Sequence, residues 1–242
     1  MKPSCHIAEA LIGDGPADSP VESTLSALGA ALNAQDAGTH AHSQRLIYYA
    51  LALGRLLGLP QTELLTLKHG VFLHDIGKIS VSERILRKSG PLSRTEWVEM
   101  RLHPVIGYGI ASSIPGLRAA APIVLAHHEW YDGTGYPRRL KGSDIPLGAR
   151  ICSVVDTFDA LTSVRPYRSP LSMVKACDQV WSESGTHFDP LVADAFLTVP
   201  PAEWERLQSS TTRKLRLPQP EPVLSVRGRS SRLACAFSAL PF

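Results

Sequence analysis

The chain has 242 residues, of which 44% are hydrophobic and 19% are charged. This balance is typical of a globular protein and excludes a chain that is disordered throughout. The formal net charge is only +3, which argues against bulk electrostatic binding of nucleic acid. The four cysteines lie far apart in the sequence, so we expect no disulfide framework and a reducing, cytoplasmic environment.

The N-terminal residues contain no apolar run of the kind found in a signal peptide. No stretch reaches the roughly 18 apolar residues that a membrane span needs, so we expect no contact with a membrane. Gly13, Gly15, Pro16 and Pro20 interrupt any regular pattern in residues 1–20. This segment is predicted to be a flexible N-terminal arm.

From residue 21 to residue 200, apolar residues recur at every third and fourth position, which gives a helix one hydrophobic face. Clear segments of this kind are residues 46–57, 63–74 and 150–161. Alternating strand patterns are scarce. We therefore predict one all-α domain over residues 21–200, a bundle of about six to eight helices with functional loops. Trp97 and Trp181 are expected in its core.

Local signals mark two further helices. Ser93 and Glu96 have the spacing of a capping box. Ser169-Pro170 is a typical start for a helix, which Gly185 would end. Turn-forming residues concentrate at 80–92 and 131–147, where we expect the loops.

Residues 201–242 differ from the rest of the chain. Seven of the ten charged residues from Ala202 onward are basic, and serine and proline are frequent. This segment is predicted to be a basic, largely disordered tail. The chain before His42 is too short for a receiver or sensory domain, so no such domain is expected beside the bundle.

Nine histidines are present, and their positions carry most of the functional argument. Five of them and two aspartates fall in or beside predicted helices. A soluble core rarely buries so many titratable side chains without a partner, and a divalent metal ion supplies one. Seven side chains are too many for one tetrahedral ion but suit two ions, above all if Asp75 bridges them. The candidate ligands are His42, His74, Asp75, His103, His127, His128 and Asp156.

The simpler alternative is that these histidines are unrelated surface residues. We adopt that interpretation for the four isolated histidines, to which we assign no role. They are His6, His40, His69 and His187. For the other five, the motifs around them favour a common function.

These motifs follow one another in a fixed order along the chain. They are His74-Asp75-Ile76-Gly77-Lys78, His127-His128-Glu129, Asp132-Gly133-Thr134-Gly135-Tyr136-Pro137 and Arg165-Pro166-Tyr167-Arg168. Together they resemble the HD-GYP family, the cyclic di-GMP phosphodiesterase branch of the HD-domain metallohydrolases. The resemblance covers residues 36–190 and implies the helical bundle of HD domains.

The resemblance implies two metal sites that share one aspartate. One ion is held by the positions that match His42, His74, Asp75 and Asp156. The second is held by those that match His103, His127 and His128, with Asp75 between the ions. Some members hold a third ion through a glutamate four residues before the first histidine, but Gly38 occupies that position here. We therefore expect two divalent ions, iron or manganese as in related members.

The resemblance also implies how the substrate is held. Lys78 matches the family lysine near the scissile phosphate, so Asp75 and Lys78 are the predicted catalytic residues. Arginine suits phosphate groups, and glycine lets backbone approach a ligand closely. Tyr136 has two open roles, stacking on a guanine or bonding to phosphate. The predicted substrate-binding residues are Lys78, Gly135, Tyr136, Pro137, Arg165 and Arg168.

The predicted activity is hydrolysis of cyclic di-GMP to the linear dinucleotide pGpG, with GMP as a possible later product, by a metal-activated hydroxide. Two alternatives stay open: another HD-type nucleotide phosphohydrolase, and a receptor or interaction module that binds cyclic di-GMP without hydrolysing it. The loop with Gly135-Tyr136-Pro137 and the C-terminal tail are candidate contacts for a signalling protein.

Overall fold

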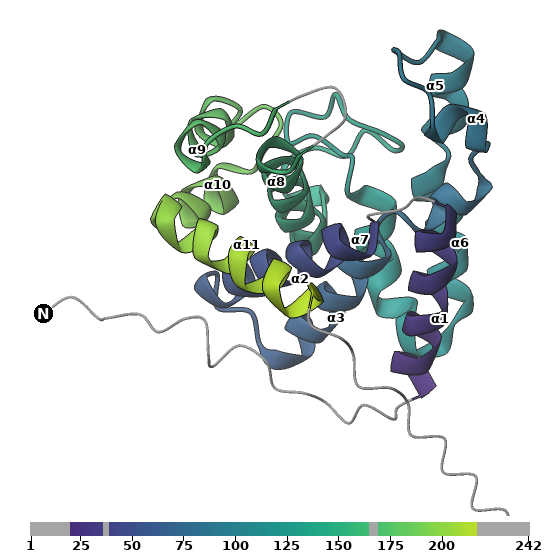
Figure 1. Cartoon of the computed structure of the whole chain (residues 1–242), viewed down its shortest axis with the longest axis horizontal. Coiled ribbons are helices and arrows are strands. Elements are labelled where there is room, and N and C mark those ends of the chain that lie inside the picture. The colour runs from purple at the N-terminus through teal and green to yellow at the C-terminus, as the bar shows by residue number, and fades with distance from the viewer. Residues whose placement is uncertain (1–19, 36–38, 165–168, 217–242) are drawn as a thin grey trace, which may run out of the picture.

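The computed structural model describes residues 20–35, 39–164 and 169–216, and these residues form an all-α bundle without β-strands (Figure 1). The predicted fold class is confirmed. The α-helices are α1 (Pro20–Gln35), α2 (Thr39–Leu56), α3 (Gln61–Leu73), α4 (Glu83–Leu86), α5 (Arg94–Met100), α6 (His103–Ser113), α7 (Ala121–Ala126), α8 (Leu147–Thr162), α9 (Met173–Ser182), α10 (Pro190–Leu197) and α11 (Pro201–Arg216). Short 3₁₀ helices are Ile76–Ser80, Pro115–Ala120 and Gly142–Asp144.

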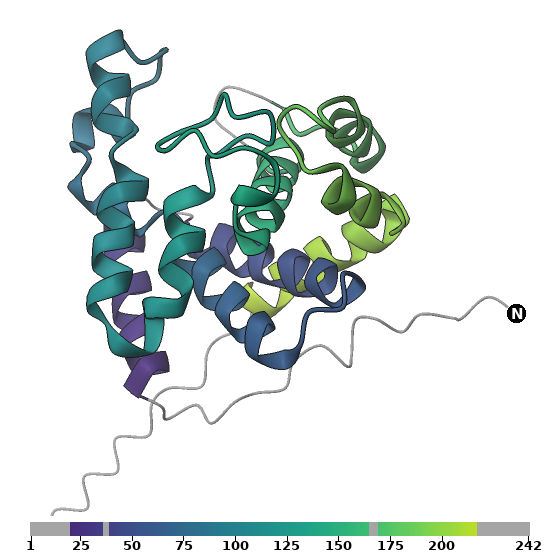
Figure 2. The ribbon, with the colours of Figure 1, turned by 180° about the vertical axis from the view of Figure 1, so that it is seen from behind.

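Helix α2 is the central element of the bundle. It packs against α3, α8 and α11, whereas α6 packs against α7 and the 3₁₀ helix Ile76–Ser80. Figures 1 and 2 show α9, α10 and α11 on one side of the molecule and α1 and α6 on the other.

Aromatic side chains fill the centre of the larger hydrophobic core. Tyr49, Phe158, Phe196 and Trp204 are all fully buried and come from α2, α8, α10 and α11. The Phe196 and Trp204 rings are stacked with their centroids 4.6 Å apart, and Tyr49 meets Trp204 edge to face at 5.7 Å. Such aromatic pairs add stability beyond the area that they bury.

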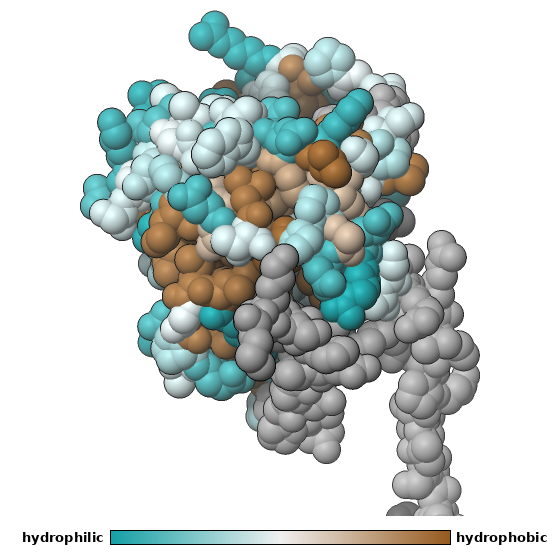
Figure 3. All heavy atoms as spheres, turned by 90° about the vertical axis from the view of Figure 1, so that its left-hand side faces the viewer, coloured by the Kyte–Doolittle hydropathy of each residue, from teal (hydrophilic) through white to brown (hydrophobic). Residues whose placement is uncertain are grey.

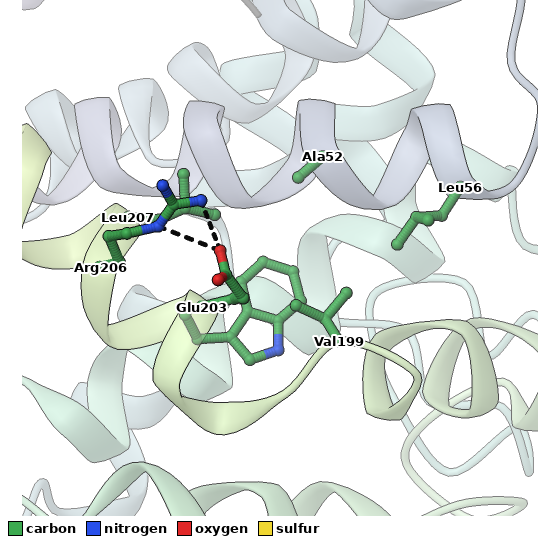
Figure 4. Close-up of a pocket in the computed structure, with 7 residues that line it drawn as sticks. Ala52, Leu56, Val199, Glu203, Arg206 and Leu207 are labelled. Atoms are coloured by element: carbon green, nitrogen blue, oxygen red, sulfur yellow. Dashed lines mark hydrogen bonds and ion pairs between the residues drawn. The ribbon is translucent and has the colours of Figure 1, made fainter. Parts of the chain in front are cut away.

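The structure corrects the predicted end of the domain at residue 200. Residues 201–216 form α11, and its Trp204 and Leu207 pack in the main core instead of belonging to a disordered tail. Figure 4 shows Leu207 and Val199 near α2, and the ion pair between Glu203 and Arg206 of α11, which line a small pocket together with Ala52 and Leu56 of α2. Residues 217–242 lie outside the described residues.

Helix α1 closes a second, smaller hydrophobic cluster. Its Leu25 and Leu32 are buried against Leu73, Leu117 and Val124. The predicted N-terminal arm lies outside the described residues, except for Pro20, which begins α1.

The local helix signals are partly confirmed. The capping box forms as predicted: Ser93 Oγ accepts from the backbone N–H of Glu96, and the Glu96 carboxylate accepts from that of Ser93. Helix α9 begins later than expected, because Ser172 caps it in place of Ser169.

The surface is mixed in character. On the face shown in Figure 3, hydrophobic side chains gather in one area beside hydrophilic ones. Trp97 and Trp181 were both expected in the core, and both expectations are wrong, because these side chains are 45% and 63% exposed. Among the described helices, none has the length and apolarity that crossing a membrane requires.

Candidate metal centre

The fold brings all seven candidate ligands to one place. His42 lies on α2, Asp156 on α8, and the other five lie at or next to the ends of α3, α6 and α7. They form two groups whose members contribute possible ligand atoms within 4.8 Å of one another: His42 with His74 and Asp75, and His103 with His127 and His128. Because helix ends hold most of these side chains, their positions are fixed by the bundle itself.

Asp156 belongs to the first group. One of its carboxylate oxygens lies 3.3 Å from His42 Nε2. The first group thus combines two imidazoles with two carboxylates, a mixed nitrogen and oxygen set that accepts several divalent first-row metals.

Asp75 connects the two groups. Its Oδ2 lies 3.2 Å from His74 Nε2 in the first group, and its Oδ1 lies 3.5 Å from His103 Nε2 in the second. The carboxylate therefore presents one oxygen to each group.

Backbone carbonyls fix the orientation of three imidazoles. In His74, His103 and His127, Nδ1 lies 2.7–2.8 Å from the carbonyl oxygen of the residue three positions earlier. A carbonyl only accepts hydrogen bonds, so each Nδ1 carries a proton, and in the neutral imidazole Nε2 then keeps a lone pair. Metal-bound histidines are oriented in this way, through the nitrogen that does not bind the ion.

The arrangement of the Nε2 atoms fits a cation. His103 Nε2 and His127 Nε2 lie 3.2 Å apart, although both nitrogens are acceptors in this tautomer. His74 Nε2 is buried without a hydrogen-bond donor. Acceptors that face one another in a buried site repel, and a positive ion between them turns this cost into a favourable interaction. The residues present therefore fit divalent metal ions.

The protonation of the second group also suits metal binding. Burial, together with the neighbouring histidines, holds the pKa of His127 well below its ordinary value and lowers that of His128 to about 3. Both imidazoles are therefore neutral at pH 7, which is the form that binds metals.

The first group differs because carboxylates surround it. Burial lowers the pKa of His42, but hydrogen bonds and charges from Asp156 and Asp159 outweigh burial and raise the pKa to about 9. Burial alone would raise the pKa of Asp75. The positive charges of Lys78 and His74 outweigh the effect of burial, so the pKa of Asp75 lies well below its ordinary value. A divalent ion would interact directly with these carboxylates, and its binding would displace the His42 proton.

Asp159 orients His42. Its carboxylate is buried, lies 2.8 Å from His42 Nδ1, and accepts hydrogen bonds from Arg45 Nε at 2.6 Å and Nη2 at 2.8 Å. The two arginine bonds fix the carboxylate, and the carboxylate in turn fixes the imidazole so that Nε2 faces Asp156.

Asp159→Asn is expected to lower the affinity of the first group for a divalent ion by about 10- to 100-fold, because the charged acceptor of His42 Nδ1 is lost. Equilibrium dialysis with elemental analysis measures this loss. Asp178→Asn, at an exposed position on α9, is the matched control. An unchanged affinity in the Asp159 variant would show that His42 does not need this carboxylate.

A cavity of about 390 Å³ opens beside the two groups. Its walls include the candidate ligands His127, His128 and Asp156, together with side chains that could contact a bound molecule. These further lining residues are Trp97, Arg101, Trp130, Thr134, Gly135, Tyr136, Ser153, Thr157 and His187.

The loop with Gly135 and Tyr136 forms one wall of this cavity. Gly135 is buried, and a Cβ added to it would lie 2.2 Å from the backbone nitrogen of Trp130, so this close approach requires glycine. The Tyr136 N–H donates to the carbonyl of His128, and its ring stacks on the His128 imidazole with centroids 4.8 Å apart. Pro137 follows in the same loop and is half-buried.

Of the three basic residues predicted to bind substrate, the structure describes only Lys78. Lys78 Nζ donates to Asp75 Oδ2 at 2.7 Å, so its charge lies directly beside the bridging carboxylate. Arg165 and Arg168 lie outside the described residues, and their role stays a prediction.

Sequence reasoning missed His187, Trp130 and Arg101 as residues of the cavity. His187 reaches it because its carbonyl accepts from the N–H of Tyr131, which joins the turn before α10 to the loop after α7. This contact spans more than fifty residues. The one available signal was the position of Trp130 directly after His127-His128-Glu129.

Comparisons with known proteins identify relatives of this chain. The model of the HD domain family matches residues 27–192. The chain is 41% identical over 176 residues to the cyclic di-GMP phosphodiesterase response regulator RpfG of Xanthomonas campestris. This match covers 72% of this chain and 47% of that protein. It is 39% identical over 165 residues to a cyclic di-GMP phosphodiesterase of Thermotoga maritima, covering 67% of this chain and 45% of that protein.

Two further relatives are informative. The 3'3'-cGAMP-specific phosphodiesterase 2 of Vibrio cholerae is 36% identical over 172 residues, covering 70% of this chain and 33% of that protein. The crystal structure of V-cGAP3, a cyclic GMP-AMP phosphodiesterase of V. cholerae, superposes with a TM-score of 0.58 at 21% identity, covering 81% of this chain and 53% of that one. The chain spans less than half the length of these curated relatives, and the structural match confirms the fold.

Proposed function

This chain belongs to the HD domain family, and from this premise we propose that it is a metal-dependent phosphodiesterase that hydrolyses cyclic di-GMP. The resemblance to the HD-GYP branch is confirmed by relatives named for that activity. The observation that carries the proposal is Asp75, whose two oxygens face two separate groups of histidines.

Each group would hold one divalent ion. His42, His74 and Asp156 would bind the first, and the second would lie among the three histidines of the other group, with Asp75 shared. Bound ions supply charge neutralisation and an activated water for hydrolysis of a phosphodiester. The carboxylates and imidazoles suit iron or manganese, which the resemblance favours.

Lys78 would act on the phosphate. Its ammonium group donates to Asp75 Oδ2 and remains partly accessible to solvent. A fixed positive charge there offsets the negative charge that develops on the phosphate oxygens during attack. Opening one phosphodiester of the ring would yield pGpG, and a second hydrolysis would yield GMP.

Two further expectations concern the setting of the reaction. Cys152 and Cys177 are buried and unpaired, which supports action in the reducing cytoplasm. A signalling protein would contact the loop around Gly135-Tyr136-Pro137 or the C-terminal tail, whose residues after Arg216 lie outside the described part of the chain.

A second candidate substrate is a mixed cyclic dinucleotide. Relatives of 36%, 34% and 35% identity are named 3'3'-cGAMP-specific phosphodiesterases. This substrate keeps the phosphodiester ring and changes one base, so the same metal centre would serve.

Incubating the metal-loaded protein with cyclic di-GMP, 3'3'-cGAMP and mononucleotides in parallel tests the proposal. We expect release of linear dinucleotide from cyclic di-GMP, detected by chromatography. Faster turnover of 3'3'-cGAMP would favour the second candidate, and turnover of mononucleotides alone would favour a general phosphohydrolase. Tight binding of cyclic di-GMP without any product would instead identify a receptor.

Gly135→Ala is expected to lower kcat/KM for cyclic di-GMP by about 10- to 100-fold, because a Cβ would clash with backbone and displace Tyr136. Steady-state kinetics measure the loss. Gly109→Ala is the matched control, since a Cβ there meets nothing within 4 Å. Equal activity of the two variants would contradict a role for the loop in binding substrate.

A further inference from the structure

A row of planar side chains leads from the metal centre to the rim of the cavity. The Tyr136 ring stacks on the His128 imidazole. The Arg101 guanidinium lies over two aromatic rings, 5.1 Å from the centroid of Tyr136 and 5.7 Å from the centroid of Trp97. Trp97 and Arg101 are both exposed and both line the cavity. We call Trp97 and Arg101 the first platform.

A second aromatic surface lines the same cavity. The Trp130 indole stacks on His187 with centroids 4.5 Å apart, and His187 stacks in turn on Phe188 at 4.2 Å. His187 is also held by Glu183 through Nδ1 and by Ser153 through Nε2. Trp130 therefore rests on a fixed support while 41% of its surface stays exposed. We call Trp130 and His187 the second platform.

The two platforms come from different segments of the chain, and Trp130 lies on the loop that follows α7. Trp97 and Arg101 lie on α5 and at its end, whereas His187 lies between α9 and α10. Figures 1 and 2 both show α5 on one side of this loop and α9 and α10 on the other. The ligands His127, His128 and Asp156 lie in the same cavity as both platforms.

Exposed tryptophans around a metal centre need an explanation, because large aromatic side chains are usually buried. Aromatic rings and guanidinium planes are the surfaces on which proteins stack unpaired nucleobases. A cyclic dinucleotide carries two bases on one phosphodiester ring, so a metal centre that holds its phosphate would leave one base on each side.

We propose that Trp97 with Arg101, and Trp130 supported by His187, stack the two bases of a cyclic dinucleotide while its phosphodiester lies at the metal centre. This inference rests on the proposed function and adds the residues that recognise the bases. The platforms contribute to affinity for the nucleotide and not to the attack on phosphorus.

The test compares Trp97→Ala, Trp130→Ala and the double variant with the unaltered protein, all loaded with metal. Binding is measured by calorimetry with a hydrolysis-resistant phosphorothioate analogue of cyclic di-GMP. Each single variant is expected to bind about 5- to 100-fold more weakly, the range measured for loss of one base–aromatic stack. The double variant should show the product of the two losses, because the platforms are separate.

Metal content, measured by elemental analysis, should be unchanged in the same variants, whereas KM for cyclic di-GMP should rise. Trp181→Ala is the matched control, because this tryptophan is 63% exposed and lies outside the cavity. Trp97→Phe and Trp130→Phe should restore most of the affinity, since a stacking ring remains.

The outcomes separate this inference from the proposed function. Affinity that is unchanged in both tryptophan variants, or an equal fall in metal content, would overturn the platforms even if cyclic di-GMP is hydrolysed. Weaker binding in the variants with no turnover by the unaltered protein would support the platforms and overturn the phosphodiesterase. Absence of any binding by the unaltered protein would overturn both.

Discussion

Asp75→Asn is expected to lower kcat/KM for cyclic di-GMP by more than about 100-fold, while the helical content stays unchanged. The substitution keeps the shape of the side chain and removes the negative charge shared by the two histidine groups. Two ions held close together repel one another, and the bridging carboxylate is the group that offsets this repulsion. Metal content should therefore fall together with activity.

Elemental analysis, circular dichroism and steady-state kinetics on one preparation measure these effects. Asp194→Asn, at an exposed position on α10, is the matched control and should keep full activity and metal. Full activity in the Asp75 variant would show that the reaction does not need an aspartate shared by the two histidine groups. Loss of helical content would instead show that Asp75 is needed for folding.

Trp204→Ala is expected to lower the free energy of unfolding by about 3–5 kcal/mol, the usual cost of removing a large aromatic side chain from a core. For a domain of this size, that loss lowers Tm by roughly 6–20 °C. The reason is the position of Trp204, which packs against Tyr49, Phe158 and Phe196. Thermal denaturation followed by circular dichroism measures the change.

Trp181→Ala again provides the comparison, since an exposed tryptophan should contribute within about 0.5 kcal/mol. Deleting residues 201–242 should lower the free energy of unfolding further than Trp204→Ala does, because the deletion removes all of α11. A truncated chain that melts at the temperature of the full chain would show that α11 is dispensable.

Sequence periodicity predicted most of the fold because each helix buries one face. The segments around α2, α3 and α8 carry this pattern clearly. Helix α11 was missed because its composition is polar, although Trp204 and Leu207 have helical spacing. The start of α9 was misplaced because Ser169 and Ser172 are equally good caps, and only packing decides between them.

The convergence of the candidate site could be predicted because its residues occur in ordered motifs. Gly135 and Tyr136, in the wall of the cavity, were predicted to bind substrate, but Trp97 and His187 were not, since Trp97 belongs to no motif, His187 was assigned no role, and both reach the cavity through contacts between distant segments. A tryptophan in a helical pattern usually indicates core, so Trp97 was assigned to the wrong environment. Its exposure is understandable only once the cavity beside it is known.

The bonds from three imidazoles to carbonyls three residues earlier have a consequence for how this chain can vary. These carbonyls belong to helical turns, so the direction of each Nε2 is set by the phase of its helix. Deleting one residue inside α3 or α7 would rotate His74 or His127 by about 100° around the helix axis and point the nitrogen away from its neighbours. Insertions in the connecting loops leave that phase untouched, so length changes should be tolerated between the helices and not within them.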